Sequence, residues 1–182
     1  RPDVPTLLIV GGSLGTRTLN EAMKRYADSL GANPDVQVIW QTGKYYEKEM
    51  EAFMASRHCP NIWRGAFIDR MDYAYAAARV VVSRSGDCTV SELARAGKAV
   101  IFVPSPNVAE NHQTKNARAL ADRDAALLIP DAEAVERALP AALELLGDRD
   151  RIARLESNIR HMATPDAARD VATEILRLVG RA

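Results

Sequence analysis

The sequence predicts an α/β fold, an open, doubly wound parallel sheet of about six strands that ends in consecutive helices. Short, β-branched, almost wholly apolar runs alternate with longer amphipathic stretches along most of the 182 residues. Such alternation is typical of right-handed βαβ units. Because the short runs are apolar on both faces, they indicate strands that helices cover on each side, as in parallel sheets.

Four strands have a clear pattern and two a weaker one. The clear strands are residues 6–10, 36–40, 79–83 and 99–103, and the weaker ones are 62–65 and 125–129. Helices are predicted between them at residues 16–30, 45–55, 69–77, 89–96 and 113–121. The last third changes to consecutive helices at residues 131–146, 148–161 and 165–179, delimited by Asp and Pro start signals and by Gly stop signals.

Composition excludes several classes of protein. The 24 basic side chains balance 24 acidic ones, so no net charge favours nucleic acid or an anionic membrane, and no nucleic-acid partner is expected. No apolar run approaches the roughly 18 residues of a membrane span. Cys59 and Cys88 form no C-x-x-C pair and no disulfide framework, which favours a reducing, cytoplasmic compartment. Residues 1–182 are expected to form a single domain, since no linker is visible.

A glycine-rich loop, Gly11 to Thr16, follows the first strand and opens the first helix. Glycines allow a close approach to a ligand, and the helix N-terminus favours an anion. The loop is not the dinucleotide fingerprint, because Ser13 occupies the place of the second glycine. It matches the G-x-S-x-G nucleophile elbow, with His112 downstream. However, only ten residues precede it, which leaves no earlier strand–helix loop for an oxyanion hole. A glycine turn that merely packs helix on strand is the other alternative.

The second loop follows the strand at 79–83 and reads Arg84-Ser85-Gly86, before a helix expected to begin near Thr89. Its backbone N–H groups suit a phosphate, and the Glu92 carboxylate suits the two hydroxyls of a ribose. The alternative, which spacing alone favours, is a capping box between Thr89 and Glu92.

The third loop, residues 104–116, begins with prolines and continues with amides. Prolines fix the loop after its strand, and the side chains of His112, Gln113 and Asn116 can hydrogen-bond neutral hydroxyls. Such groups favour a sugar over a charged ligand.

Together, the loops resemble the MurG family of UDP-N-acetylglucosamine transferases, over nearly the whole chain. The matching pieces, in the family's order and at matching separations, are residues 11–17, 67–71, 84–86, 89–92 and 112–117. The resemblance implies the Rossmann-like, C-terminal, donor-binding half of a two-domain GT-B glycosyltransferase. It also implies that the N-terminal, acceptor-binding domain is absent from this chain.

The resemblance implies a donor site for UDP-N-acetylglucosamine, with no metal and no other cofactor. The implied donor-binding residues are Gly12, Ser13, Leu14, Gly15, Phe67, Ile68, Met71, Ser85, Gly86, Asp87, Cys88, Thr89, Val90, Ser91, Glu92, His112, Gln113 and Asn116. By that likeness the glycine loop faces the diphosphate, and Ile68 reads the uracil through its backbone. Glu92 holds the ribose, while His112 and Gln113 hold the sugar hydroxyls.

One departure from the family pattern lies in the second loop. Asp87 and Cys88 stand where the family has alanine and an aliphatic residue. A carboxylate beside a diphosphate is unfavourable, so either Asp87 points away from the donor or the donor binds more weakly.

The implied reaction is an inverting transfer of N-acetylglucosamine to undecaprenyl-linked muramyl-pentapeptide, converting lipid I to lipid II in peptidoglycan synthesis. The catalytic base and the membrane-facing surface belong to the missing domain, so this chain alone is expected to bind donor without catalysing transfer. The full-length protein is expected on the cytoplasmic face of the bacterial inner membrane. The alternatives are an enzyme similar to UDP-N-acetylglucosamine 2-epimerase, also of GT-B fold, and a noncatalytic nucleotide-sugar binding module.

Overall fold

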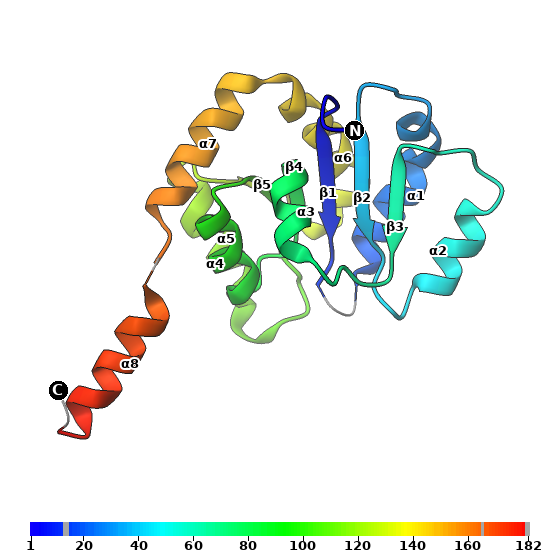
Figure 1. The fold of residues 1–182 in the computed structure, drawn as a ribbon. Coiled ribbons are helices and arrows are strands. Elements are labelled where there is room, and N and C mark those ends of the chain that lie inside the picture. The colour runs from blue at the N-terminus through cyan, green and yellow to red at the C-terminus, as the bar shows by residue number, and fades with distance from the viewer. Residues whose placement is uncertain (13–14, 165, 181–182) are drawn as a thin grey trace.

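Six strands form one parallel sheet in the order β3-β2-β1-β4-β5-β6 (Figure 1). The structure is a computed structural model and describes residues 1–12, 15–164 and 166–180. The strands are β1 (Thr6–Val10), β2 (Gln37–Gln41), β3 (Ile62–Gly65), β4 (Ala78–Ser83), β5 (Ala99–Phe102) and β6 (Leu127–Leu128). The strand order reverses between β1 and β4, as in a doubly wound fold. The predicted sheet class and strand number are thereby confirmed.

Helices cover both faces of the sheet. The first face carries α1 (Arg17–Gly31), α2 (Glu47–Met54) and α6 (Asp131–Gly147), and the second carries α3 (Met71–Ala77), α4 (Asp87–Ala96) and α5 (His112–Ala121). Helix α7 (Arg149–His161) contributes to the cores on both faces. A short 3-10 turn, η1 (Ala109–Asn111), precedes α5.

Alternation along β1 shows why its apolar run is continuous. Leu7 and Ile9 pack into the core beneath α1 and α6, whereas Leu8 and Val10 pack into the core beneath α3, α4 and α5. Side chains of a strand point alternately to opposite faces, so a strand with both faces covered needs apolar residues at every position.

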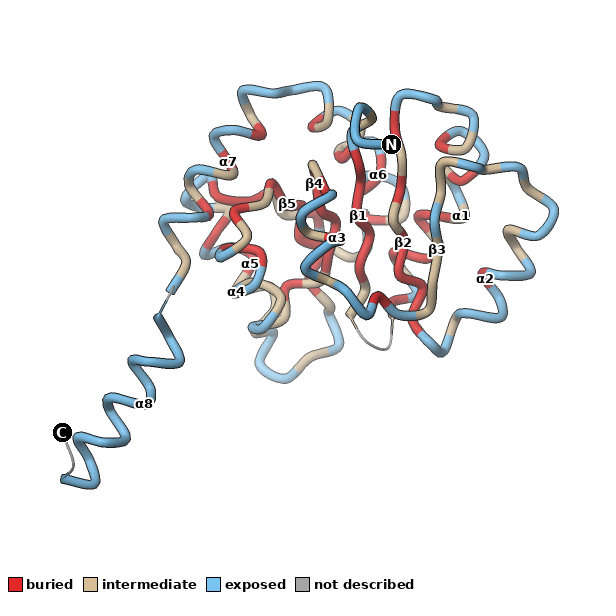
Figure 2. The backbone as a smooth tube through the Cα atoms, viewed as in Figure 1, coloured by how far each residue is buried: buried red, intermediate tan, exposed pale blue. Residues whose placement is uncertain are grey.

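Helix α8 (Ala167–Leu178) extends away from the rest of the molecule (Figure 1). All of its residues are exposed, as Figure 2 shows, including the apolar side chains of Val171, Ile175 and Leu178. In the part of the chain that the structure describes, no helix is both long enough and apolar enough to span a membrane.

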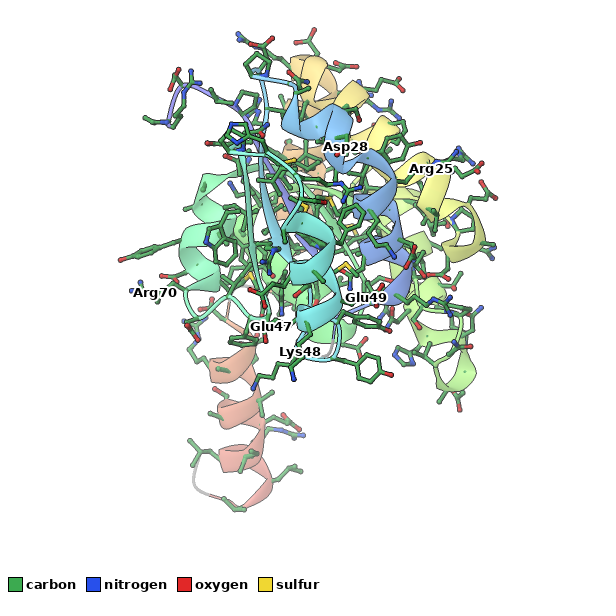
Figure 3. All side chains as sticks on the ribbon, turned by 90° about the vertical axis from the view of Figure 1, so that its right-hand side faces the viewer. Arg25, Asp28, Glu47, Lys48, Glu49 and Arg70 are labelled. Carbon is green, nitrogen blue, oxygen red and sulfur yellow. The ribbon has the colours of Figure 1, made fainter. Side chains whose placement is uncertain are left out.

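Charged side chains on α1 and α2 form a solvated surface rather than a site. Glu47, Lys48 and Glu49 project from the outer side of α2 (Figure 3), where Glu49 lies 3.1 Å from Lys24 of α1. Arg70, at the start of α3, lies on the opposite side of the sheet from Arg25 of α1 (Figure 3). Exposed ion pairs of this kind each contribute less than about 1 kcal/mol to stability.

Candidate functional site

The loops singled out by the sequence follow the carboxyl ends of β1, β4 and β5. The carboxyl end of β1 and the loop that leads into α5 lie along the lower edge of the molecule in Figure 1. The strand order reverses between β1 and β4, and in open parallel sheets ligands bind outside the carboxyl ends of the strands at this reversal. The candidate site therefore lies at this edge.

The glycine loop after β1 requires glycine for steric reasons. Gly12 and Gly15 have φ angles of 81° and 76°, a region that other residues rarely adopt. A Cβ atom on Gly15 would lie 2.1 Å from the Thr42 carbonyl oxygen, so no larger residue fits there. Ser13 and Leu14 lie outside the described residues, so their donor contacts and the nucleophile hypothesis for Ser13 stay predictions.

A buried polar side chain holds the start of α1 against the end of β2. Asn20 Nδ2 donates to the Thr42 carbonyl at 2.9 Å, and Trp40 Nε1 donates to Asn20 Oδ1 at 2.9 Å. Asn20 is almost fully buried, and a buried amide needs such partners. Trp40 is thereby a structural residue that fixes the loop after β2.

Helix α4 begins at Asp87, two residues earlier than the sequence indicated. Gly86 is its extended N-cap residue, and the Val90 N–H closes the first turn on the Gly86 carbonyl at 2.9 Å. The N–H groups of Asp87, Cys88 and Thr89 precede that first intrahelical bond, as at any helix N-terminus. Such N–H groups favour an anion, and their binding of a phosphate stays a prediction.

The prediction of a capping box between Thr89 and Glu92, which spacing alone favoured, is wrong. Both residues lie inside α4, and the helix has no side-chain cap. The Glu92 carboxylate instead accepts a hydrogen bond from Tyr75 Oη of α3 at 2.9 Å. Glu92 is therefore available on the helix surface rather than used at the helix start.

Hydrogen bonds join the start of α5 to the loop after β4. Ser85 Oγ donates to the Gln113 carbonyl at 2.8 Å, and Ser85 is 0% exposed. Asn116 Nδ2 donates to the Ser85 carbonyl at 3.1 Å and to Asp87 Oδ1 at 2.6 Å. The Ser85 hydroxyl thus supports the site from within, and both hydrogens of the Asn116 amide are committed inside the protein.

Two side chains at the start of α5 are oriented by their own loop. Gln113 Oε1 accepts the Ser105 N–H at 2.9 Å, which leaves the Nε2 hydrogens for another partner. His112 Nδ1 lies 2.9 Å from the Ala109 carbonyl, and since a carbonyl only accepts, Nδ1 carries the proton. The two residues therefore offer fixed polar groups at the site, as expected for binding a neutral hydroxylated ligand.

Sequence reasoning missed the residue that connects the loops. The Arg84 guanidinium donates to Thr16 Oγ1 at 2.5 Å, to Asp131 Oδ1 at 2.5 Å and to the Val103 and Pro104 carbonyls at 2.9 and 3.1 Å. It thus ties the end of β4 to the starts of α1 and α6 and to the loop after β5. The sequence did contain one sign of this role, because Arg84 directly follows a buried strand. A charged side chain that is largely buried at such a place needs a fixed partner.

Residues 67–70 lie between β3 and α3, and Met71 is the first residue of α3. Ile68 is 8% exposed and packs in the core on the α3 side of the sheet, so its side chain offers little surface to a ligand, and its backbone contact with a uracil stays a prediction. Phe67 is 47% exposed. Met71 lines a groove of about 580 Å³ between α3 and α4, together with Tyr75 and Glu92.

The predicted residues thus fall into linked groups rather than one closed pocket. Direct hydrogen bonds join residues 85–87 with 113 and 116, and Arg84 joins this group to the start of α1. Cys88, Thr89, Val90 and Ser91 lie on the first turns of α4. Among the described residues, no group of three or more histidine, cysteine or carboxylate side chains is placed to hold a metal ion.

The family model of the glycosyltransferase family 28 C-terminal domain matches residues 6–171 of this sequence. A UDP-N-acetylglucosamine–N-acetylmuramyl-(pentapeptide) pyrophosphoryl-undecaprenol N-acetylglucosamine transferase of Parabacteroides distasonis is 44% identical over 99% of this chain and 49% of its own length. The transferase of the same name from Porphyromonas gingivalis is 49% identical over 96% of this chain and 46% of its own length.

Solved structures agree with these matches. The crystal structure of Acinetobacter baumannii MurG superposes with a TM-score of 0.81 at 32% identity, over 96% of this chain and 52% of that one. The calicheamicin glycosyltransferase CalG4, at 19% identity and a TM-score of 0.70, shares the fold. The prediction of half of a GT-B glycosyltransferase is thereby confirmed. The chain spans about half the length of the curated relatives it matches, and it belongs to glycosyltransferase family 28, as a C-terminal domain of that family.

Proposed function

We propose that this chain is the donor-binding half of an N-acetylglucosaminyltransferase of the MurG type, with UDP-N-acetylglucosamine as its donor. The observation that carries the proposal is the placement of two complementary groups on α4. The N–H groups at its start have no partner within the helix and suit a diphosphate, and the Glu92 carboxylate lies five residues beyond Asp87. At 1.5 Å per residue the separation along the helix is about 7.5 Å, which suits the distance from a diphosphate to its ribose hydroxyls.

The chemistry proposed for the whole protein is a displacement at the anomeric carbon. The acceptor hydroxyl forms a new bond to that carbon, the bond to the diphosphate oxygen breaks, and UDP leaves with the electron pair. The hydroxyl proton passes to a base in the other half of the protein. The N-terminus of α4 stabilises the charge that develops on the diphosphate, since preorganised N–H donors favour a departing anion. In this proposal the helix end replaces a metal ion.

The sugar is held, in this proposal, by the start of α5. The Gln113 Nε2 group donates to a sugar oxygen, because its Oε1 atom is already used by the Ser105 N–H. The acceptor, undecaprenyl-linked muramyl-pentapeptide, binds the other half of the full-length protein, which acts at the cytoplasmic face of the inner membrane. The names of the relatives, which include N-acetylglucosamine and the undecaprenol-linked acceptor, support this choice of substrates.

Calorimetric titration of the chain with UDP-N-acetylglucosamine, UDP-N-acetylgalactosamine and GDP-mannose tests the proposal. We expect the first to bind most tightly and GDP-mannose not to bind. Gln113→Glu keeps an oxygen for the Ser105 N–H but replaces the outward donor by an acceptor. This variant should bind UDP like the parent and lose the additional affinity that the sugar provides.

The outcomes separate the alternatives. Failure of the parent chain to bind any UDP-sugar at millimolar concentration contradicts the proposal. Binding of UDP-N-acetylglucosamine by the chain, together with its conversion to the 2-epimer by the full-length protein, assigns the protein to an epimerase instead. Binding by a full-length protein that transfers no sugar to the lipid acceptor indicates a noncatalytic module.

A further inference from the structure

Helices α3 and α4 lie side by side and enclose a groove that both Tyr75 and Glu92 line. Tyr75 comes from the middle of α3, and its ring packs against the core on that side of the sheet. Its hydroxyl reaches the exposed end of Glu92, where Oη donates to Oε2 at 2.9 Å. A long, exposed glutamate side chain is thereby held by a partner that is itself fixed by packing.

Tyr75 acts only as a donor in this pair. Burial raises the pKa of the Tyr75 hydroxyl above its ordinary value, and the neighbouring Glu92 carboxylate raises it further. The hydroxyl therefore keeps its proton throughout the physiological range. An ionised carboxylate has no proton to donate, so the direction of the hydrogen bond is fixed from Tyr75 to Glu92.

The bond leaves the carboxylate able to bind a ligand. A carboxylate has about four lone-pair positions on its two oxygens, and Tyr75 occupies one of them. The remaining positions suit a vicinal diol, whose two hydroxyls both donate. Because Tyr75 already fixes the Glu92 rotamer, ligand binding also loses less side-chain entropy than it would with a flexible glutamate.

We propose that Tyr75 is a positioning residue that holds the Glu92 carboxylate in the orientation required to accept both hydroxyls of a ribose. This inference rests on the proposed function, because it assumes a uridine nucleotide as the ligand. Tyr75 does not touch the ligand, and its contribution passes entirely through Glu92.

Titration calorimetry with UDP and with 2′,3′-dideoxy-UDP, which lacks the diol, tests the inference on the 182-residue chain. Tyr75→Phe removes the hydroxyl and keeps the packed ring. We expect it to weaken UDP binding about fivefold, as for the loss of one hydrogen bond, and to leave dideoxy-UDP binding unchanged. A merely structural defect would weaken both ligands equally.

Two further variants sharpen the result. Tyr73→Phe is the matched control, because Tyr73 lies on the same helix, is 64% exposed and stacks against Arg70. It should bind both ligands like the parent. In a Glu92→Ala background, Tyr75→Phe should have no further effect, since residues that act through one group are not additive.

The outcomes distinguish this inference from the proposed function. If the parent binds UDP better than dideoxy-UDP while Tyr75→Phe retains that preference, the positioning role is overturned and the proposed function stands. If the parent binds neither ligand at millimolar concentration, the proposed function fails and the inference fails with it.

Discussion

Asn116 Nδ2 donates to Asp87 Oδ1 at 2.6 Å and holds a carboxylate in the first turn of α4. Negative charge at this position stabilises the helix, because it interacts favourably with the helix dipole. The same charge lies beside the N–H groups proposed to bind a diphosphate. We therefore expect Asp87 to stabilise the helix and to weaken the binding of that diphosphate.

The charge of Asp87 can be removed without changing its shape. We expect Asp87→Asn to bind UDP about fivefold more tightly, because two unit charges 4 Å apart in water repel by about 1 kcal/mol. Uridine, which has no phosphate, should bind both proteins equally, and high salt should reduce the difference. Titration calorimetry at low and high ionic strength measures the effect.

Asp150→Asn is the control for this experiment. Asp150 lies in the first turn of α7, so both substitutions remove an acid from a helix start and should cost about 0.5 kcal/mol of stability. Only Asp87→Asn should change the affinity for UDP. Equal UDP affinity of Asp87→Asn and the parent would show that the carboxylate lies away from the bound phosphates.

Arg84 and Asp131 form a partly buried ion pair that joins the loops of the site. Their side chains are only 13% and 22% exposed, and removing one partner of such a pair leaves the other charge uncompensated. We expect Arg84→Met to lower the free energy of unfolding by about 3 kcal/mol. It should also weaken UDP binding, because Arg84 fixes Thr16 at the start of α1. Urea denaturation and calorimetry measure the two effects.

The exposed pair between Arg177 and Glu174 on α8 provides the comparison. Glu174→Gln should change the free energy of unfolding by less than about 0.5 kcal/mol, since solvent screens this pair. If Arg84→Met is as stable as Glu174→Gln, the ion pair does not hold the loops together.

Local pattern was sufficient to predict most of the fold and the place of the site. Buried strands such as β1 and β4 are apolar on both faces, and their loops must lie at one edge of a parallel sheet. The start of α4 was misplaced because the sequence offers Thr89 as a cap, whereas the extended backbone of Gly86 already allows the first turn to close. Backbone geometry of this kind cannot be read from residue type alone.

Contacts between distant side chains could not be predicted in this way. Arg84 and Asp131 are 47 residues apart, and Tyr75 and Glu92 are 17 apart on different helices. Their meeting depends on how α6 and α3 pack on the sheet, which periodicity does not specify. The sequence therefore identified the residues that carry polar groups at the site more readily than those that orient them.

We expect the reactivity of Cys88 to report on occupancy of the proposed site. It is exposed on the first turn of α4, whereas Cys59 is partly buried and burial raises the pKa of its thiol. Since the thiolate is the reactive form, Cys88 should react with iodoacetamide first at neutral pH. Cys59 should react appreciably only at higher pH, where its thiolate forms.

A ligand bound at the start of α4 should shield Cys88. We expect UDP to slow the alkylation of Cys88 in proportion to the occupied fraction and to leave Cys59 unaffected, as measured by mass spectrometry of the modified peptides. In Cys88→Ser only the slow reaction should remain. Alkylation of Cys88 at the same rate with saturating UDP would place the nucleotide elsewhere.

We expect helix α8 to contribute little to the stability of the chain. Its residues are all exposed, so we expect its deletion to uncover little apolar surface. We expect a chain that ends at Thr164 to keep its free energy of unfolding to within about 1 kcal/mol, because the hydrophobic contribution scales with the apolar area removed from water. In contrast, Ile159→Ala, at a fully buried position of α7, should cost about 2–5 kcal/mol. Urea denaturation compares the two, and a loss on truncation as large as that of Ile159→Ala would mean that α8 packs against the domain in solution.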